Sequence, residues 1–138
     1  MKRTIIADSS GIISLISGSD KNHIRALKIS RKLEQAKGSI IIPSDVFSET
    51  LNIAGKKLGH NIALSISEKI QSAESFIILD SNEKIRSRAL ALFKDQPESV
   101  SFTDCIVMAV AYNFESKDIF GFDKVFKNNG YRRVGVDE

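Results

Sequence analysis

Four acidic residues stand at positions where a fold can gather them: Asp8, Glu49, Asp104 and Asp123. Asp8 follows the apolar run 4–7, and Asp123 follows the apolar run 119–122. If both runs are parallel strands, the two carboxylates lie at the carboxyl edge of the sheet, where open α/β sheets bind their ligands. Clustered carboxylates repel one another unless a cation lies among them, and oxygen ligands suit a hard divalent ion. The pattern therefore predicts a metal site.

Each of these acids also has a structural role open to it. Asp8 could cap a helix that begins near Ser10, and Asp104 could serve only to complement a helix dipole. Glu49 could lie on a solvated helix face, and Asp123 could open a turn. The order of the four acids along strand ends and helix starts favours convergence on one point, since a doubly wound sheet brings such positions together.

The elements that must position these acids follow from hydrophobic periodicity. Short, nearly continuous apolar runs, typical of strands covered on both faces, lie at 4–7, 39–42, 76–79 and 119–122, with a weaker fifth at 134–136. Apolar residues recur at helical spacing over 26–36, 47–58, 62–73 and 85–92. The segment 103–112 has no polar stripe, so we expect a buried helix there, with Ser101 as its N-cap. Alternation of strands and helices predicts an α/β fold with a parallel sheet.

Composition narrows the class of protein. The 138 residues, 42% hydrophobic, fit one domain spanning 1–138. No apolar run approaches the roughly 20 residues that span a bilayer, and the amino terminus has no signal-type apolar region, so we expect a cytoplasmic protein without membrane contact. A single cysteine, Cys105, excludes an internal disulfide and a multi-cysteine zinc site.

The net charge is only +3, but if the acids gather at one site the remaining surface is more basic. Basic residues that could form a phosphate-binding rim, or a merely solvated surface, are Lys56, Lys57, Lys124, Lys127, Arg132 and Arg133.

Four segments together carry a family resemblance: 5–10 (IIADSS), 48–51 (SETL), 101–106 (SFTDCI) and 120–126 (FGFDKVF). Their order and spacing resemble the PIN domain, and the short length is similar to that of the VapC toxins of prokaryotic toxin–antitoxin pairs. The similarity covers essentially the whole chain. It implies a PIN-like three-layer sandwich with a central parallel sheet of order 3-2-1-4-5, and a metal-dependent endoribonuclease that hydrolyses RNA phosphodiester bonds.

The resemblance also implies roles for individual residues. The four acids would bind Mg²⁺ or Mn²⁺ directly or through water, and hydroxyls of Ser10, Ser101 or Thr103 could hold water or phosphate. Asp80, which follows an edge strand, would be remote from them and is expected to be a helix cap. The chain departs from the family at Gly121, where Thr or Ser is common, so a supporting hydroxyl is absent there.

The resemblance implies an antitoxin partner, and the apolar helix faces lead us to expect a homodimer. We expect an arginine of the antitoxin to reach the acids from a groove beside helices over 20–37 and 45–73. Rival interpretations are a free-standing PIN-domain RNA-processing nuclease, a non-catalytic PIN-like domain that binds RNA or protein, and a receiver-like phosphoacceptor domain. A receiver requires paired acids after its first strand, whereas Asp8 is followed by two serines.

Overall fold

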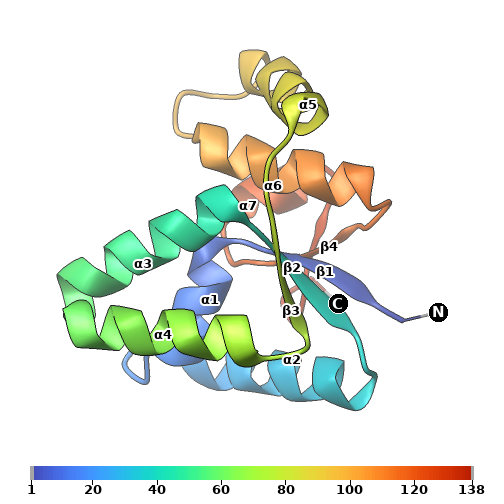
Figure 1. The fold of residues 1–138 in the computed structure, drawn as a ribbon. Coiled ribbons are helices and arrows are strands. Elements are labelled where there is room, and N and C mark those ends of the chain that lie inside the picture. The colour runs from blue at the N-terminus through green and yellow to red at the C-terminus, as the bar shows by residue number, and fades with distance from the viewer. Residues whose placement is uncertain (1, 138) are drawn as a thin grey trace.

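The structure is a computed structural model that describes residues 2–137, and its core is a five-stranded parallel sheet of order β3-β2-β1-β4-β5 (Figure 1). The strands are β1 (Thr4–Ala7), β2 (Ser39–Pro43), β3 (Phe76–Leu79), β4 (Asp118–Phe120) and β5 (Arg132–Arg133). The helices are α1 (Ser9–Ile16), α2 (His23–Gln35), α3 (Ser44–Leu58), α4 (His60–Ser72), α5 (Glu83–Lys94), α6 (Phe102–Asn113) and α7 (Lys124–Asn128).

The central strand β1 sets the position of the acidic residues. Ile6 pairs with Ile41 of β2 on one side and with Ile119 of β4 on the other. Because β1 and β4 are parallel neighbours, Asp8 and the segment that leads to Asp123 leave the sheet at the same edge. The predicted strand order is confirmed. A receiver domain, whose order is 2-1-3-4-5, is excluded.

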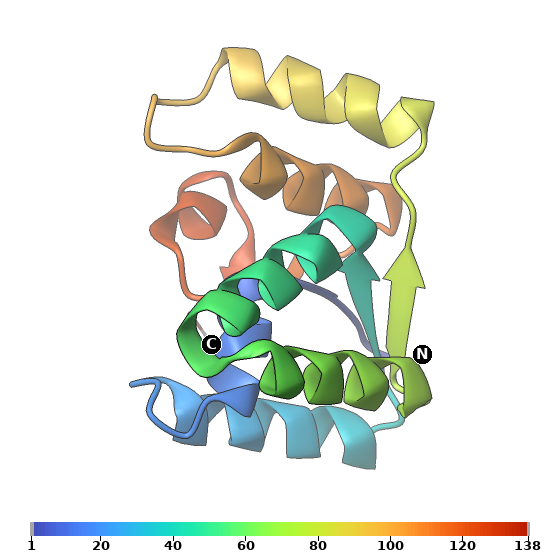
Figure 2. The ribbon, with the colours of Figure 1, turned by 60° about the vertical axis from the view of Figure 1, so that its left-hand side comes forward.

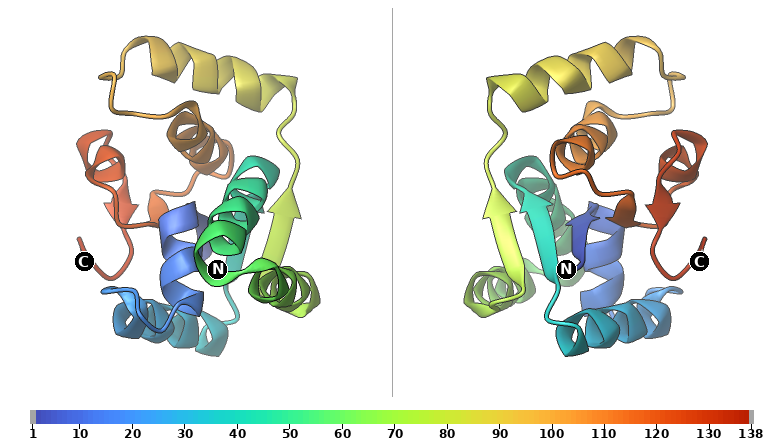
Figure 3. Two further views of the ribbon diagram at one scale, coloured as in Figure 1. Left: turned by 90° about the vertical axis from the view of Figure 1, so that its left-hand side faces the viewer. Right: turned by 90° about the vertical axis from the view of Figure 1, so that its right-hand side faces the viewer.

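Helices flank this sheet as the sequence predicts for an α/β sandwich. The opposed views of Figure 3 show α1 and α3 on one side of the strands. Helix α6 contacts β1, β2 and α3, and α5 packs on its outer surface (Figure 2). Residues 105–111 of α6 are all buried, Cys105 among them, which explains why this helix has no polar stripe.

Helix α1 approaches β4 very closely at Gly11. A Cβ atom at this position would lie 2.2 Å from the Phe120 carbonyl oxygen, so no larger residue fits without moving the backbone. The contact brings the start of α1, and with it Asp8, against the end of β4. Gly11 therefore helps to place the acidic residues, a role that the sequence alone did not reveal.

Several predicted features differ from the structure, and the first is the fourth strand, which is Asp118–Phe120 and not 119–122. The fifth strand is Arg132–Arg133 and not 134–136, because Gly135 adopts a φ of +76° and ends the pairing. The short helix α7 follows Asp123 where only a turn was considered. The side chain of Asn82, not Asp80, caps α5 by accepting a hydrogen bond from the Ile85 amide at 2.9 Å.

Within residues 2–137, no helix has both the length and the apolar character needed to cross a membrane.

Candidate active site

Asp8 is a buried carboxylate at the point where β1 passes into α1. Its side chain is the N-cap of α1 and accepts hydrogen bonds from the Ser10 hydroxyl at 2.8 Å and from the Ser10 amide at 3.4 Å. The pKa of Asp8 is raised from 3.8 to about 6, mainly by burial; the charges of Asp104 and Glu49 contribute to the rise, and the Ser10 hydrogen bonds oppose it. The capping role is confirmed, and Asp8 is also an acid whose ionisation is opposed by its surroundings.

Ser10 links Asp8 to the segment after β4. Its hydroxyl donates to Asp8 and accepts a hydrogen bond from the Phe122 amide at 3.1 Å. Phe122 directly precedes Asp123, so one side chain connects the two chain segments that carry acids. Ser10 therefore lies beside Asp8 with its hydroxyl bonded to protein groups, and its predicted contact with water or phosphate stays a prediction.

Asp104 begins α6 through a capping box. The Ser101 hydroxyl accepts from the Asp104 amide, and the Asp104 carboxylate accepts from the Ser101 amide, both at 3.1 Å. Burial raises the pKa of Asp104, and the charges of Asp123 and Glu49 add to the rise. Ser101 thus caps the helix, and Thr103 lies half-buried in the same first turn.

The four acids share one electrostatic environment. Glu49, half-buried on α3, interacts with both Asp8 and Asp104, and Asp123 interacts with Asp104. Asp104 and Asp123 also line one recess of about 260 Å³. Asp123 itself is exposed and caps α7 through the Val125 amide at 3.1 Å. Charge interactions therefore link Asp104 to Glu49 on α3 and to the acids that precede α1 and α7.

The ligand chemistry of this group is that of a hard cation. All four side chains offer oxygen atoms, which Mg²⁺ and Mn²⁺ prefer. Within the described residues, no group of three or more His, Cys, Asp or Glu side chains is arranged so that it could hold a metal ion. Mg²⁺ needs only one or two carboxylates and keeps several waters, so such a cluster is not required for the residues to fit it.

Gly121 lies directly against Asp8. A Cβ atom at Gly121 would be 2.9 Å from the Asp8 Cβ and 3.2 Å from Cε2 of Phe126. Gly121 therefore carries no hydroxyl, and Asp8 packs closely on its backbone. The same carboxylate accepts a hydrogen bond from the hydroxyl of Ser10, which lies two residues after Asp8 in the chain.

Arg133 supports the Asp123 segment, and sequence reasoning did not identify this role. Its guanidinium donates to the Phe122 carbonyl at 3.1 Å and is held by Asp137 through two contacts of 2.9 and 3.0 Å. The charge of Asp123 contributes to a raised pKa of Arg133, after the hydrogen bond to Asp137. The sequence offered only an Arg-Arg pair, with no sign that the second arginine turns toward the acids.

Asp80 lies apart from this group. It follows β3 at the sheet edge, separated from β1 by β2, and its side chain is exposed. Its expected remoteness agrees with this position, although its expected capping role is wrong because Asn82 caps α5. Asp80 is therefore a natural control for the four acids.

Residues 5–130 match the PIN domain family, so the chain belongs to the PIN domain family. Among solved structures it resembles VapC20 from Mycobacterium tuberculosis, described as a sarcin–ricin loop cleaving toxin, with a TM-score of 0.81 and 20% sequence identity. The match covers 94% of this chain and 98% of that chain. At this identity the similarity establishes the fold. No curated protein sequence matches the chain.

Proposed function

We propose that the protein is a Mg²⁺- or Mn²⁺-dependent endoribonuclease that hydrolyses RNA and acts as the toxin of a type II toxin–antitoxin pair. The main support is Asp8, a buried carboxylate on the central strand whose pKa is raised by burial and by Asp104 and Glu49. In a PIN domain fold, such a group at the carboxyl edge of the sheet is best explained by a divalent ion that offsets the repulsion.

The proposed roles follow the positions of the side chains. Asp8, Glu49, Asp104 and Asp123 would hold the metal, either directly or through water. A bound divalent ion would activate water and stabilise charge on the phosphoryl oxygens. Ser10 fixes the direction of the Asp8 carboxylate and its spacing from the Phe122 amide. The Ser101 hydroxyl fixes the start of α6, and so the position of Asp104.

Hydrolysis by water is favoured over attack by the RNA 2′-hydroxyl, because neither histidine is positioned as a base. His23 donates through Nδ1 to the Ser14 carbonyl at 2.8 Å. His60 begins α4, and neither histidine is among the groups that perturb Asp8 or Asp104. The carboxylates are then the groups that orient the attacking water.

The proposed partners are RNA, an antitoxin and a second copy of the chain, with action in the cytoplasm. Large apolar side chains are exposed on α4, β3 and α5, namely Ile62, Leu64, Ile77, Leu90 and Phe93. Such residues support an association surface. Mass measurement in solution tests the homodimer, and co-expression with the product of the adjacent gene tests the antitoxin.

The direct test of the activity is cleavage of RNA in Mg²⁺, Mn²⁺ and EDTA by the wild-type protein and the Asp123→Asn variant. We expect cleavage only with a divalent ion, and a loss of at least about a hundredfold in the variant. If the protein cleaves RNA but is not toxic to a host cell, and the product of the adjacent gene does not bind it, a free-standing RNA-processing nuclease would be favoured. RNA binding without cleavage in either metal would show a non-catalytic PIN-like domain.

A further inference from the structure

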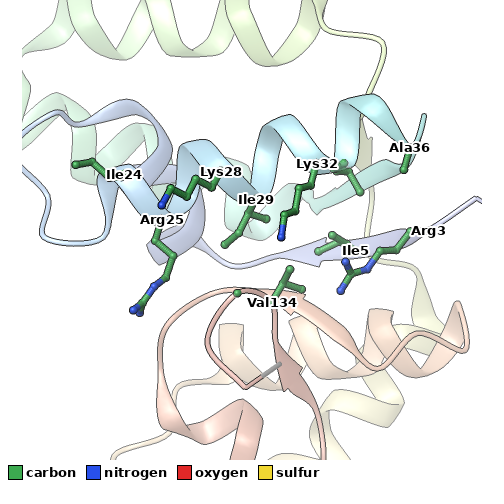
Figure 4. A pocket seen from close by; sticks show the side chains of 11 residues that line it. Arg3, Ile5, Ile24, Arg25, Lys28, Ile29, Lys32, Ala36 and Val134 are labelled. Carbon is green, nitrogen blue, oxygen red and sulfur yellow. The ribbon is translucent and has the colours of Figure 1, made fainter.

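A cavity of about 480 Å³ lies between α2, β1 and the residues that follow β5 (Figure 4). Side chains of Ile5, Ile29 and Val134 project into it and form an apolar floor. The volume lies within the range of about 300 to 1,000 Å³ that is usual for ligand pockets. This cavity is separate from the recess that Asp104 and Asp123 line.

The rim of the cavity is cationic. Arg25, Lys28 and Lys32 are exposed on α2, and Figure 4 shows them on the side of the helix that borders the cavity. Their spacing along the helix axis is about 4.5 and about 6 Å, from a rise of 1.5 Å per residue. Within residues 2–137 these three side chains form no ion pair, and no Asp or Glu lines the cavity. A fourth cation, Arg3, is bonded to Asp118 at 2.9 Å.

Two contacts link the elements around the cavity to the segments that carry the acids. Val134 and Gly135 follow Arg133, whose guanidinium holds the Phe122 carbonyl beside Asp123. At the other side, His23 begins α2 and bonds the Ser14 carbonyl of α1, the helix that Asp8 caps. The start of α2 therefore lies about 9 Å from Asp8 along the axis of α1, since Ser14 follows Asp8 by six residues.

We infer that this cavity binds the single-stranded segment of an RNA substrate that flanks the scissile bond, with one base on the apolar floor and its phosphates along Arg25, Lys28 and Lys32. The inference rests on the proposed ribonuclease function. Four carboxylates at the acidic site repel a phosphate backbone, and a row of cations outside that site, without acidic neighbours, can hold it. Cationic grooves beside surfaces that accept unstacked bases are typical of single-strand binding.

The test measures binding of a fluorescently labelled single-stranded oligoribonucleotide by anisotropy in EDTA, where cleavage does not interfere. Arg25→Glu should weaken binding by about tenfold, whereas Arg31→Glu should change it by less than about twofold. Arg31 is the matched control, because it is an exposed arginine on the same helix that does not line the cavity. The Lys28→Ala/Lys32→Ala variant should reduce the slope of log affinity against log salt by about 1.4.

Equal losses in Arg25→Glu and Arg31→Glu, or none in either, would overturn the inference. So would a result in which Arg25→Glu abolishes capture of an acidic partner peptide but leaves RNA binding intact, since the occupant would then be a protein segment. The proposed function fails separately, if the wild-type protein binds RNA through this rim but cleaves none in Mg²⁺ or Mn²⁺. If all cavity variants cleave and bind RNA normally, the proposed ribonuclease function would stand and the proposed RNA-binding role of the cavity would be wrong.

Discussion

The Asp8 carboxylate has two contrary effects on the stability of the folded protein. As the N-cap of α1 it satisfies the Ser10 amide, which stabilises the helix start. As a buried anion beside Glu49 and Asp104 it destabilises the folded chain, because each of these influences disfavours its charge. A bound cation would remove that destabilisation while leaving the cap in place. Replacing Asp8 should therefore change stability and activity in opposite directions, and both can be measured.

The Asp8→Asn variant should lose RNA cleavage and gain stability in metal-free buffer. The pKa is about 6 in the folded state against 3.8 as its ordinary value, so ionised Asp8 destabilises the fold by roughly 3 kcal/mol. This destabilisation is small at pH 4, where Asp8 is protonated in the folded state and partly protonated in the unfolded state, and it is complete above about pH 6. Urea unfolding should show a gain of about 1–3 kcal/mol in the variant at pH 7 and a much smaller gain at pH 4.

The Asp80→Asn variant is its control. Asp80 is exposed, so its replacement should leave cleavage unchanged and stability within about 0.5 kcal/mol at both pH values. If Asp8→Asn retained wild-type cleavage, or if its stability gain were as large at pH 4 as at pH 7, Asp8 would not be the strained acid described above.

Gly121 tests whether packing or a missing hydroxyl governs this part of the site. Gly121→Ala places a Cβ 2.9 Å from the Asp8 Cβ, so we expect a loss of about 1–3 kcal/mol in stability and lower cleavage. Gly18→Ala is the matched control, since a Cβ there has no neighbour within 4 Å. An increase in cleavage for Gly121→Ser would show instead that the absent hydroxyl limits the wild-type protein.

At the scale of elements, the apolar runs predicted β1, β2 and β3 well because each is covered on both faces or pairs with a buried neighbour. The fifth strand was misplaced because its two residues, Arg132–Arg133, are polar, while the apolar residues after them turn at Gly135. The acids were found because a strand end or helix start marks each of them except Glu49. The strand order came from the family resemblance, since periodicity does not determine it.

The supporting contacts of the site could not be predicted, because they join segments far apart in the chain. The Ser10 hydroxyl meets the Phe122 amide only after α1 has packed on β4 at Gly11. Arg133 reaches the Phe122 carbonyl only because β5 pairs with β4. Neither contact has a local signature in the sequence.

The ion pair of Arg133 with Asp137 should affect catalysis through the segment before Asp123. Both side chains are largely covered, with 11% and 15% exposure. Arg133→Lys keeps the charge but loses the two-point contact, so we expect kcat to fall by about tenfold with little change in KM. Asp137→Asn should have the same effect in weaker form.

Arg132→Lys is the comparison for that prediction. Arg132 bonds Asp118 at the start of β4, away from Asp123. Its replacement should lower stability without changing kcat. Equal kcat values for the Arg132 and Arg133 variants would mean that Arg133 stabilises the fold without positioning Asp123.

At the scale of the whole molecule, a net charge of +3 combines an acidic site with a cationic cavity rim along α2. The acids suit a divalent ion and the rim suits phosphate, so the two regions together suit a metal-dependent enzyme acting on a polyanion. The chain's membership of the PIN domain family is compatible with this division.

The measurement that tests this account most directly is Mn²⁺ binding by isothermal titration calorimetry to the wild-type protein, to the amide variants of Asp8, Glu49, Asp104 and Asp123, and to Asp80→Asn. We expect the wild-type protein and Asp80→Asn to bind Mn²⁺ equally. Variants of the acids that bind the ion directly should lose at least about tenfold in affinity, and variants of those that act through water somewhat less. Unchanged Mn²⁺ binding in all four variants, or none in the wild-type protein, would contradict the assignment of these acids as a metal site.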